Sequence, residues 1–234
     1  MTLAKAQYIG SGVMGANVPI ASDGFGGFSF NPSGILLGAG YQTANALDSQ
    51  GYAWSWGRNT AGQIGDNTKT NRSSPVSVVG GKQFSQISGG YYFSVALDTQ
   101  GYAWARGWNN VGQLGTNDGV SYSSPVSVVG GRQFVQLSWG SNFICALDQQ
   151  GYAWAWGAND VGQLGNNSSG TSISSPVSVV GGKQFVRISG GFSFVTALDA
   201  QGYVWSWGYN GEGQLGVGNT VSYSSPVMVV RAML

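Results

Sequence analysis

The sequence predicts an all-β protein built from four copies of a unit of about fifty residues. Three observations carry this prediction: a segment that recurs four times, apolar residues that alternate with small ones, and a composition rich in turn-forming and aromatic residues. The 234 residues include 40 glycines, 9 tryptophans and 11 tyrosines, and only 8% of them are charged. Because helical proteins favour Ala, Glu, Lys and Leu instead, we expect few helices.

The recurring segment begins with Gly-Tyr-[Ala/Val]-Trp. It starts at Gly51, Gly101, Gly151 and Gly202, which gives a period of 50, 50 and then 51 residues. The copies continue through Asn-x-x-Gly-Gln-[Leu/Ile]-Gly, a loop of variable sequence, Ser-Ser-Pro-Val-x-Val-Val, and a segment that ends in Ala-Leu-Asp-x-Gln-Gly. Four matches of this length identify an internal repeat.

Within one unit the local pattern is that of four short strands. Tyr52, Trp54 and Trp56 alternate with small residues, which places the three aromatic side chains on one face of a strand. Residues 98–101, Asp-Thr-Gln-Gly, have the composition of a tight hairpin turn. The expected strands are residues 52–56, 76–79, 84–88 and 93–97.

A four-stranded sheet of this size cannot bury both of its faces, so neighbouring sheets must stack as the blades of a β-propeller do. When the unit is taken to start at Gly51, the fourth copy stops after 33 residues and residues 34–50 match the part that it lacks. The predicted fold is therefore an all-β propeller of four four-stranded blades, one of them completed by the N- and C-terminal halves. The tryptophans expected in its core are Trp54, Trp104, Trp154 and Trp205.

The segment Trp-Gly-Ala-Asn-Asp-Val-Gly-Gln-Leu-Gly at residues 156–165 resembles the repeat of the regulator of chromosome condensation family. The likeness extends over residues 34–234 and implies a propeller, which in that family usually has seven blades. Four blades packed in the same way would cover little more than half a circle. Three arrangements stay open: two chains that together form one ring, a four-bladed ring within one chain, and an open arc capped by the glycine-rich N-terminal segment or by another protein.

Two domains are expected: a glycine-rich N-terminal arm at residues 1–33 and a propeller-repeat domain at residues 34–234. The net charge is +1, and the basic residues form no cluster, which argues against a nucleic-acid partner. No run of 18 apolar residues predicts a membrane span. The surface of neutral polar residues is typical of exported or virion-exposed proteins, and we expect a virion or extracellular location over a cytoplasmic one.

The residue types of most enzyme sites are missing. The chain has no histidine, which excludes a histidine general base and a Ser-His-Asp triad. Cys145, the only cysteine, lies in an apolar stretch and is expected to be buried and inert. No cofactor and no metal ion are predicted, and the protein is not expected to be an enzyme. Turn positions are expected for Asp48, Asp98, Asp148 and Asp199, and left-handed or turn positions for Asn59, Asn109, Asn159 and Asn210.

Departures from the repeat mark candidate partner-binding residues, because a binding site on a propeller breaks its regularity. The loops between Gln-Leu-Gly and Ser-Ser-Pro differ most between copies, and several aromatic or basic residues stand where other copies have different side chains. Tyr, Trp and Arg are also the residue types that dominate protein interfaces. The candidates are Arg106, Trp108, Tyr122, Trp139, Tyr209 and Tyr223.

The predicted function is therefore a non-enzymatic structural or interaction propeller that binds other proteins, including copies of itself. A component of a phage or virus particle is favoured by the low charge and the Ser/Asn/Gly-rich surface. The family resemblance implies an alternative, a regulator such as an enzyme inhibitor or a GTPase exchange factor. A carbohydrate-binding propeller is a third alternative, in which exposed Trp and Asn side chains would contact a glycan.

Overall fold

The computed structural model describes residues 37–230, in which all regular secondary structure is β-strand. The predicted all-β class is thus confirmed, and the described residues contain no helix of the length and hydropathy that a membrane span requires. The expected arm at residues 1–33 lies outside the described residues. In chain order the strands are β1 (Leu37–Ala39), β2 (Thr43–Leu47), β3 (Ala53–Gly57), β4 (Arg72–Ser77), β5 (Phe84–Gly89), β6 (Phe93–Asp98), β7 (Ala103–Gly107), β8 (Tyr122–Ser127), β9 (Phe134–Trp139), β10 (Phe143–Asp148), β11 (Ala153–Gly157), β12 (Ile173–Ser178), β13 (Phe185–Gly190), β14 (Phe194–Asp199), β15 (Val204–Gly208) and β16 (Tyr223–Met228).

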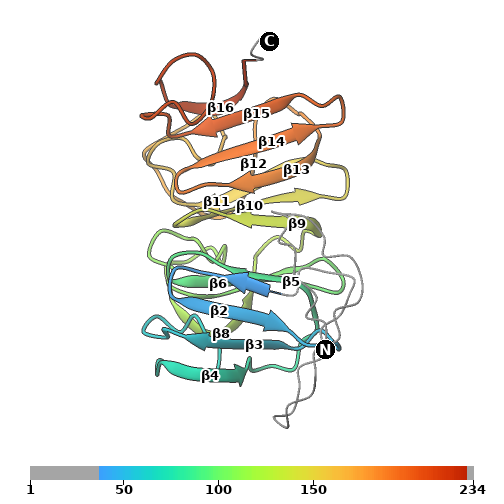
Figure 1. Ribbon diagram of the computed structural model, residues 1–234, viewed down its shortest axis with the longest axis vertical. Coiled ribbons are helices and arrows are strands. Elements are labelled where there is room, and N and C mark those ends of the chain that lie inside the picture. Colours follow the sequence, from blue (N-terminus) through green and yellow to red (C-terminus); the bar gives the residue numbers. More distant parts are fainter. Residues whose placement is uncertain (1–36, 231–234) are drawn as a thin grey trace, which may run out of the picture.

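The strands form four antiparallel sheets of four consecutive strands each: β1–β4, β5–β8, β9–β12 and β13–β16, here named sheets 1 to 4. Successive sheets pack against one another. In Figure 1 the strands of sheet 1 lead to β4 near one end of the long axis, and those of sheet 4 lead to β16 near the other. This stacking of small twisted sheets is that of successive propeller blades.

The boundary between blades differs from the predicted one. The tight turn at residues 98–101 joins β6 to β7 inside sheet 2, and a tight turn between antiparallel strands keeps them hydrogen-bonded neighbours. The chain passes to the next sheet after the fourth strand instead. The expectation of one blade completed by residues 34–50 and the C-terminal segment is therefore wrong within the described residues, because β16 pairs with β15 and β2 pairs with β3.

The central hairpin of each sheet is fixed by an aspartate and a tryptophan. In sheet 3 the Oδ1 atom of Asp148 accepts hydrogen bonds from the backbone amides of Gln150 and Tyr152. Its Oδ2 atom accepts one from Trp154 Nε1 at 2.9 Å, and the Arg132 guanidinium lies 3.4 Å from the centroid of the Trp154 ring. The predicted turn role of the aspartates is confirmed, since the same pairs recur as Asp48 with Trp54, Asp98 with Trp104 and Asp199 with Trp205.

A buried asparagine organises the loop that follows the third strand of each sheet. Asn159 donates from Nδ2 to the carbonyl of Ser168 at 3.1 Å and accepts from the amide of Leu164 at 3.1 Å. Its structural role agrees with the prediction, but its conformation is not the left-handed one. That conformation occurs further along each loop, at Asn67, Asn117 and Asn167, with φ of 61°, 62° and 63°.

Successive sheets meet face to face, and we call each such contact a seam. The second and third strands of the earlier sheet pack one face against the later sheet. Between sheets 2 and 3, Val95 and Ala105 pack with Ile144, Ala146 and Trp156. Between sheets 3 and 4 the same cluster recurs one repeat later, with Cys145 and Ala155 against Trp207. Each seam thus forms a core cluster of its own between two neighbouring sheets.

The tryptophans at the centre of this core are not the predicted ones. Trp156 and Trp207 are fully buried, whereas Trp104, Trp154 and Trp205 are partly buried beside it. The reason is the turn of the central hairpin: an indole that hydrogen-bonds an aspartate in that turn must stay near the sheet edge. The expectation that the first tryptophan of each repeat forms the core is therefore wrong in its position.

Candidate interaction surface

A cluster of aromatic side chains lies across the seam between sheets 1 and 2, and we call Tyr41, Tyr91, Tyr92 and Trp108 the aromatic cluster. The rings of Tyr41 and Tyr91 stack with centroids 4.2 Å apart. Tyr92 packs edge-on against Tyr91 at 4.5 Å and against Trp108 at 5.7 Å. These separations are those of favourable aromatic pairs, so the four rings form one contiguous patch.

The turns of two neighbouring sheets bring these residues together. Tyr41 lies in the turn between β1 and β2, and Tyr91 and Tyr92 lie in the equivalent turn between β5 and β6. The amide of Tyr41 donates to the carbonyl of Gly90, and the amide of Tyr91 donates to the carbonyl of Ser141 in sheet 3, both at 3.1 Å. Hydrogen bonds across two seams therefore hold the turns in place.

A positive charge lies next to the rings. The guanidinium of Arg58 is 4.7 Å from the centroid of the Tyr92 ring, and its Nη1 atom donates to Gln42 Oε1 at 2.8 Å and to Tyr92 Oη at 3.3 Å. The ion pair within the described residues is between Arg72 and Asp66 and does not include Arg58. The charge of Arg58 is thus stabilised by a ring and neutral groups. Hydrogen bonding with Tyr41, and then burial, raise the pKa of Tyr91 above its ordinary value.

The cluster is a local departure from the repeat. Tyr91, Tyr92 and Trp108 stand where sheet 3 has Ser141, Asn142 and Ala158. Of the predicted candidates only Trp108 belongs to the cluster. Sequence reasoning missed Tyr41, Tyr91 and Tyr92, although a tyrosine pair at a turn that holds Ser-Asn in the next copy was a visible signal.

The other predicted residues lie elsewhere. Arg106 is 1% exposed and donates to Asn45 and Ser55 within the seam between sheets 1 and 2, so it offers no surface to a partner. Tyr122 and Tyr223 begin equivalent strands, β8 and β16. The hydroxyl of Tyr122 donates to Asp118 Oδ2 at 3.0 Å, which raises the pKa of Tyr122, and that of Tyr223 accepts from Asn219 at 3.0 Å. Both tyrosines therefore brace their own loops.

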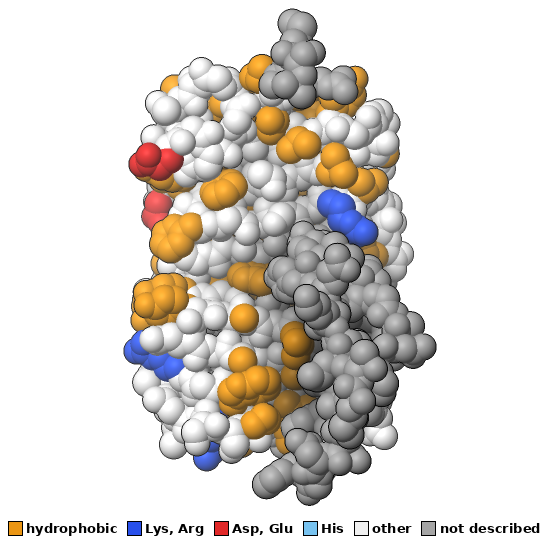
Figure 2. Space-filling model, viewed as in Figure 1, with side chains coloured by type: hydrophobic (Ala, Val, Ile, Leu, Met, Phe, Trp, Pro, Cys, Tyr) orange, Lys and Arg blue, Asp and Glu red, His pale blue; other side chains and the backbone are white. Residues whose placement is uncertain are grey.

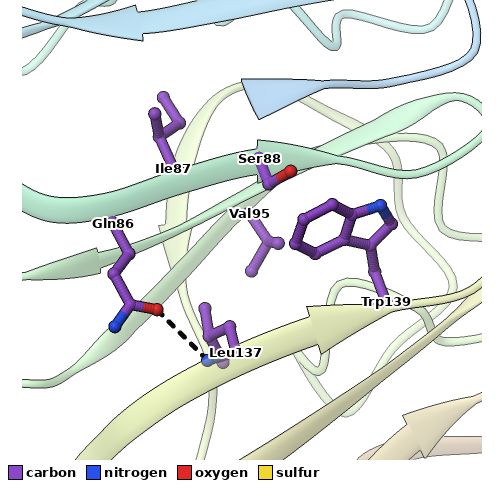
Figure 3. A pocket seen from close by; sticks show the side chains of 6 residues that line it. All are labelled: Gln86, Ile87, Ser88, Val95, Leu137 and Trp139. Atoms are coloured by element: carbon purple, nitrogen blue, oxygen red, sulfur yellow. Dashed lines mark hydrogen bonds between the residues drawn. The ribbon is translucent and has the colours of Figure 1, made fainter. Parts of the chain in front are cut away.

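Trp139 lies in the seam between sheets 2 and 3. Figure 3 shows its ring reaching from β9 toward Ser88 and Val95 of sheet 2, beside a hydrogen bond of 3.2 Å from the Leu137 amide to Gln86 Oε1. The cavity that these side chains enclose measures about 10 Å³, at the lower limit for one water molecule. Trp139 thus fills a gap between sheets and does not form a ligand pocket.

A second hollow lies at the edges of sheets 3 and 4. It encloses about 220 Å³, and its lining includes Asp160, Phe192 and Tyr209. Phe192 is 73% exposed and Tyr209 is partly exposed. Figure 2 shows that the viewed face carries few charged side chains and several separate hydrophobic patches on a largely neutral polar surface. The surface therefore offers aromatic contacts more than charge.

The repeat has a known counterpart. The regulator of chromosome condensation (RCC1) repeat matches residues 50–97, 100–147, 150–198 and 201–232, and a second description of that repeat matches residues 84–113, 134–163 and 185–214. The chain belongs to the RCC1 repeat family. The resemblance seen in the sequence is thereby confirmed.

Several solved structures share the fold, two of them of the yeast protein Prp20. The chain is similar to human WBSCR16, with a TM-score of 0.74 and 24% identity over 82% of this chain and 50% of that one. It is also similar to yeast RCC1 (Prp20) in complex with Kap60, with a TM-score of 0.75 and 19% identity over 92% of this chain and 51% of that one. A further structure of Prp20p from Saccharomyces cerevisiae gives a TM-score of 0.73 and 20% identity over 84% and 50% of the two chains.

The chain spans about half the length of the solved structures that it matches. No curated protein is significantly similar to it in sequence. The similarity establishes an RCC1-type fold in the four sheets, and the yeast relatives carrying this fold bind proteins, as their descriptions of Kap60, Gsp1p and histones state.

Proposed function

We propose that this RCC1-repeat protein is a non-catalytic propeller that binds another protein, and that the aromatic cluster is its docking surface. The observation that carries the proposal is the contiguous stack of Tyr41, Tyr91, Tyr92 and Trp108 at one edge of the molecule. Tyr, Trp and Arg supply most of the binding energy in protein interfaces, because they combine a large apolar area with hydrogen-bonding groups.

The cluster is also prepared for binding. Backbone hydrogen bonds across the seams fix the turns that carry the tyrosines, and the rings support one another. Little side-chain and loop entropy remains to be lost when a partner docks, and this loss is one of the main costs of association.

The charge of the surface indicates the chemistry of the partner. Arg58 has a ring and neutral groups around it and no ion pair among the described residues. A partner segment with an apolar side chain beside a carboxylate would cover the rings and pair with the guanidinium. Copies of this chain are included among the proposed protein partners, because sheets 1 and 4 each leave one face uncovered by the described residues.

Three more specific functions are secondary proposals: regulation of another protein, carbohydrate binding and a role in a virus particle. A regulatory role, as an enzyme inhibitor or an exchange factor, would use the same kind of protein contact. Carbohydrate binding would use the same exposed and partly exposed rings, so it becomes an outcome of the experiment. The virus-particle role rests on composition alone, and the proposal does not depend on it.

The test replaces the three cluster residues of sheet 2 by the residues found at the same positions of sheet 3. A variant with Tyr91→Ser, Tyr92→Asn and Trp108→Ala carries only side chains that the repeat already accommodates at these positions. A photo-crosslinking amino acid at Tyr91 is expected to capture a protein in the cells that produce this chain, whereas the same group at Tyr152, exposed and outside the cluster, is not.

Competition by unlabelled protein shows whether the photo-adduct forms at a specific binding surface. Excess unlabelled wild-type protein should suppress the adduct, and excess triple variant should not. Equal capture at both positions, or equal competition by both proteins, would overturn the proposal. Binding to a glycan array that is lost in the triple variant, without any protein adduct, would assign the surface to carbohydrate instead.

A further inference from the structure

The outer face of sheet 4 has the residues of a seam without the neighbour. In sheet 3 the corresponding face is covered by sheet 4, and its residues Phe143, Cys145, Leu147, Ala153 and Ala155 are all buried. In sheet 4 the equivalent positions are Phe194, Thr196, Leu198, Val204 and Ser206, of which only Ser206 is buried and Val204 is 41% exposed.

The backbone of sheet 4 also keeps the shape that receives a following sheet. A Cβ atom at Gly162 of sheet 3 would lie 2.6 Å from Ser224 Cα of sheet 4, so the two backbones touch there. Gly213 is the equivalent residue of sheet 4, with a φ of 76° against 83° at Gly162, and no atom lies within 4 Å of its Cβ position. Gly202 repeats this relation: its counterpart Gly151 faces the next sheet, and Gly202 faces open space.

A hydrogen-bond donor is in position at the same edge. The amides of Asn67, Asn117 and Asn167 each donate to a serine carbonyl of the following sheet, at 2.9, 2.7 and 2.7 Å. Gly218 is the next member of this series and has the same left-handed conformation, with a φ of 78°. The acceptor that it would need is a serine equivalent to Ser123, which in sheet 1 is Ser73.

The outer face of sheet 1 has the residues by which each later sheet packs against the sheet before it. In the later sheets this face carries an apolar residue on the first strand and a large side chain on the third, and both are buried, as in Leu137 and Trp156 of sheet 3. In sheet 1 these positions are Leu37, which is 62% exposed, and Trp56, which is only partly buried.

The two most exposed aromatic side chains of the described residues also match. The side chains of Tyr41 and Tyr91, at the same position of adjacent sheets, stack side by side. Phe192 holds this position in sheet 4. Phe192 at 73% and Tyr41 at 57% exposure thus stand at the two open ends of one row, where the next sheet would bring them together.

We infer that sheet 4 of one copy docks against sheet 1 of a second copy, head to tail, in the register of the internal seams. The occupant is a second copy because sheet 1 presents the face, the serine carbonyl and the aromatic position that the edge of sheet 4 lacks. A net charge of +1 gives little repulsion between copies. Head-to-tail contacts close into rings or extend into chains, according to the rotation per copy. This inference goes beyond the aromatic-cluster proposal, and its decisive residue, Val204, lies outside that cluster.

The first test is the oligomeric state of the full chain in native mass spectrometry and sedimentation. Species of two or more copies are expected, and they should be lost in Val204→Lys, since a lysine buried in the interface weakens association by at least about tenfold. Val186→Lys is the matched control, because Val186 is similarly exposed on sheet 4 but outside its end face. A wild-type chain that stays monomeric over the micromolar range, or equal loss in both variants, would overturn the inference.

The second test fixes the direction of docking. Tyr41→Cys and Phe192→Cys are prepared as separate chains, both at exposed positions, and then mixed under oxidising conditions. A disulfide-linked pair should form in the mixture and in neither variant alone. Cys145 is buried and should form no disulfide. Pairs that form equally within each single variant would exclude the head-to-tail register. Loss of the photo-adduct at Tyr91 with intact oligomers would refute only the docking-surface proposal.

Discussion

The guanidinium of Arg106 in sheet 2 donates a hydrogen bond of 3.0 Å to Asn45 Oδ1 of sheet 1. It also donates to Ser55 Oγ at 2.8 Å and from Nε to the carbonyl of Gln63 at 3.0 Å. Two repeats later, in sheet 4, Trp207 Nε1 donates to the equivalent carbonyl of Gln163 at 3.1 Å. Arg106 therefore takes the place of a core tryptophan.

The facing residues change together with it. Arg106 meets the polar pair Asn45 and Ser55, whereas Trp156 meets Val95 and Ala105. We expect Arg106→Trp alone to cost about 1–3 kcal/mol, because Asn45 and Ser55 each lose a buried partner. Adding Asn45→Val and Ser55→Ala should restore wild-type stability or exceed it, since an apolar seam avoids the cost of a buried cation. Urea unfolding of the single, double and triple variants measures this coupling, and additive effects would contradict it.

The pH dependence of this seam has a definite sign. Burial lowers the pKa of Arg106 to about 9, well below the ordinary range of a guanidinium. The unfolded chain then binds the proton more strongly, so the contribution of Arg106 to stability increases only as pH rises above about 9 and is flat below that value. The stability difference between wild type and the triple variant should thus not change between pH 5 and pH 8. A clear slope in that range would show that another group governs the seam.

The two tryptophans of a repeat should contribute unequally to the free energy of unfolding. Trp156→Ala is expected to cost about 3–5 kcal/mol, because it empties a fully buried site in the seam. Trp154→Ala should cost less, since this side chain is partly buried and loses mainly its contacts to Asp148 and Arg132. Chemical unfolding of both variants tests the order, and a larger effect at Trp154 would restore the core position that the sequence predicted.

Trp139 should act as a wedge between sheets. It stands where the repeats on either side have Gly89 and Gly190, and it packs against the core cluster of sheets 2 and 3. Trp139→Gly is expected to destabilise the protein by about 1–3 kcal/mol, less than Trp156→Ala, because the Trp139 side chain is only partly buried. Hydrogen exchange should show faster opening of β5 and β9 than of β13. Uniform acceleration in all sheets would place its effect elsewhere.

Cys145 should be unreactive in the folded protein. Its side chain is fully buried in the seam between sheets 3 and 4, and burial strongly raises the pKa of the thiol, so almost no thiolate is present at neutral pH. Alkylation by iodoacetamide should therefore follow global unfolding and become rapid only in denaturant. Fast labelling of the native chain would show that this seam opens readily.

The sequence by itself determined the repeat, the all-β class and the turn chemistry. These features are local: alternation in Tyr52 to Trp56, an aspartate and a glycine around each hairpin, and an asparagine in each loop all act over a few residues. It also indicated Trp108 as a departure from the repeat. Where one blade ends and the next begins was misjudged, because a periodic sequence can be divided at any point of its period.

Only the tertiary structure decided what each position faces. Trp154 and Trp156 lie on the same face of one strand, yet the central hairpin holds Trp154 and the seam buries Trp156. Arg106 reads as a surface cation in sequence, and the polar pair that accepts it lies more than fifty residues earlier, in another sheet. The aromatic cluster likewise joins turns fifty residues apart. Such contacts depend on the stacking of sheets, and no pattern within one strand encodes them.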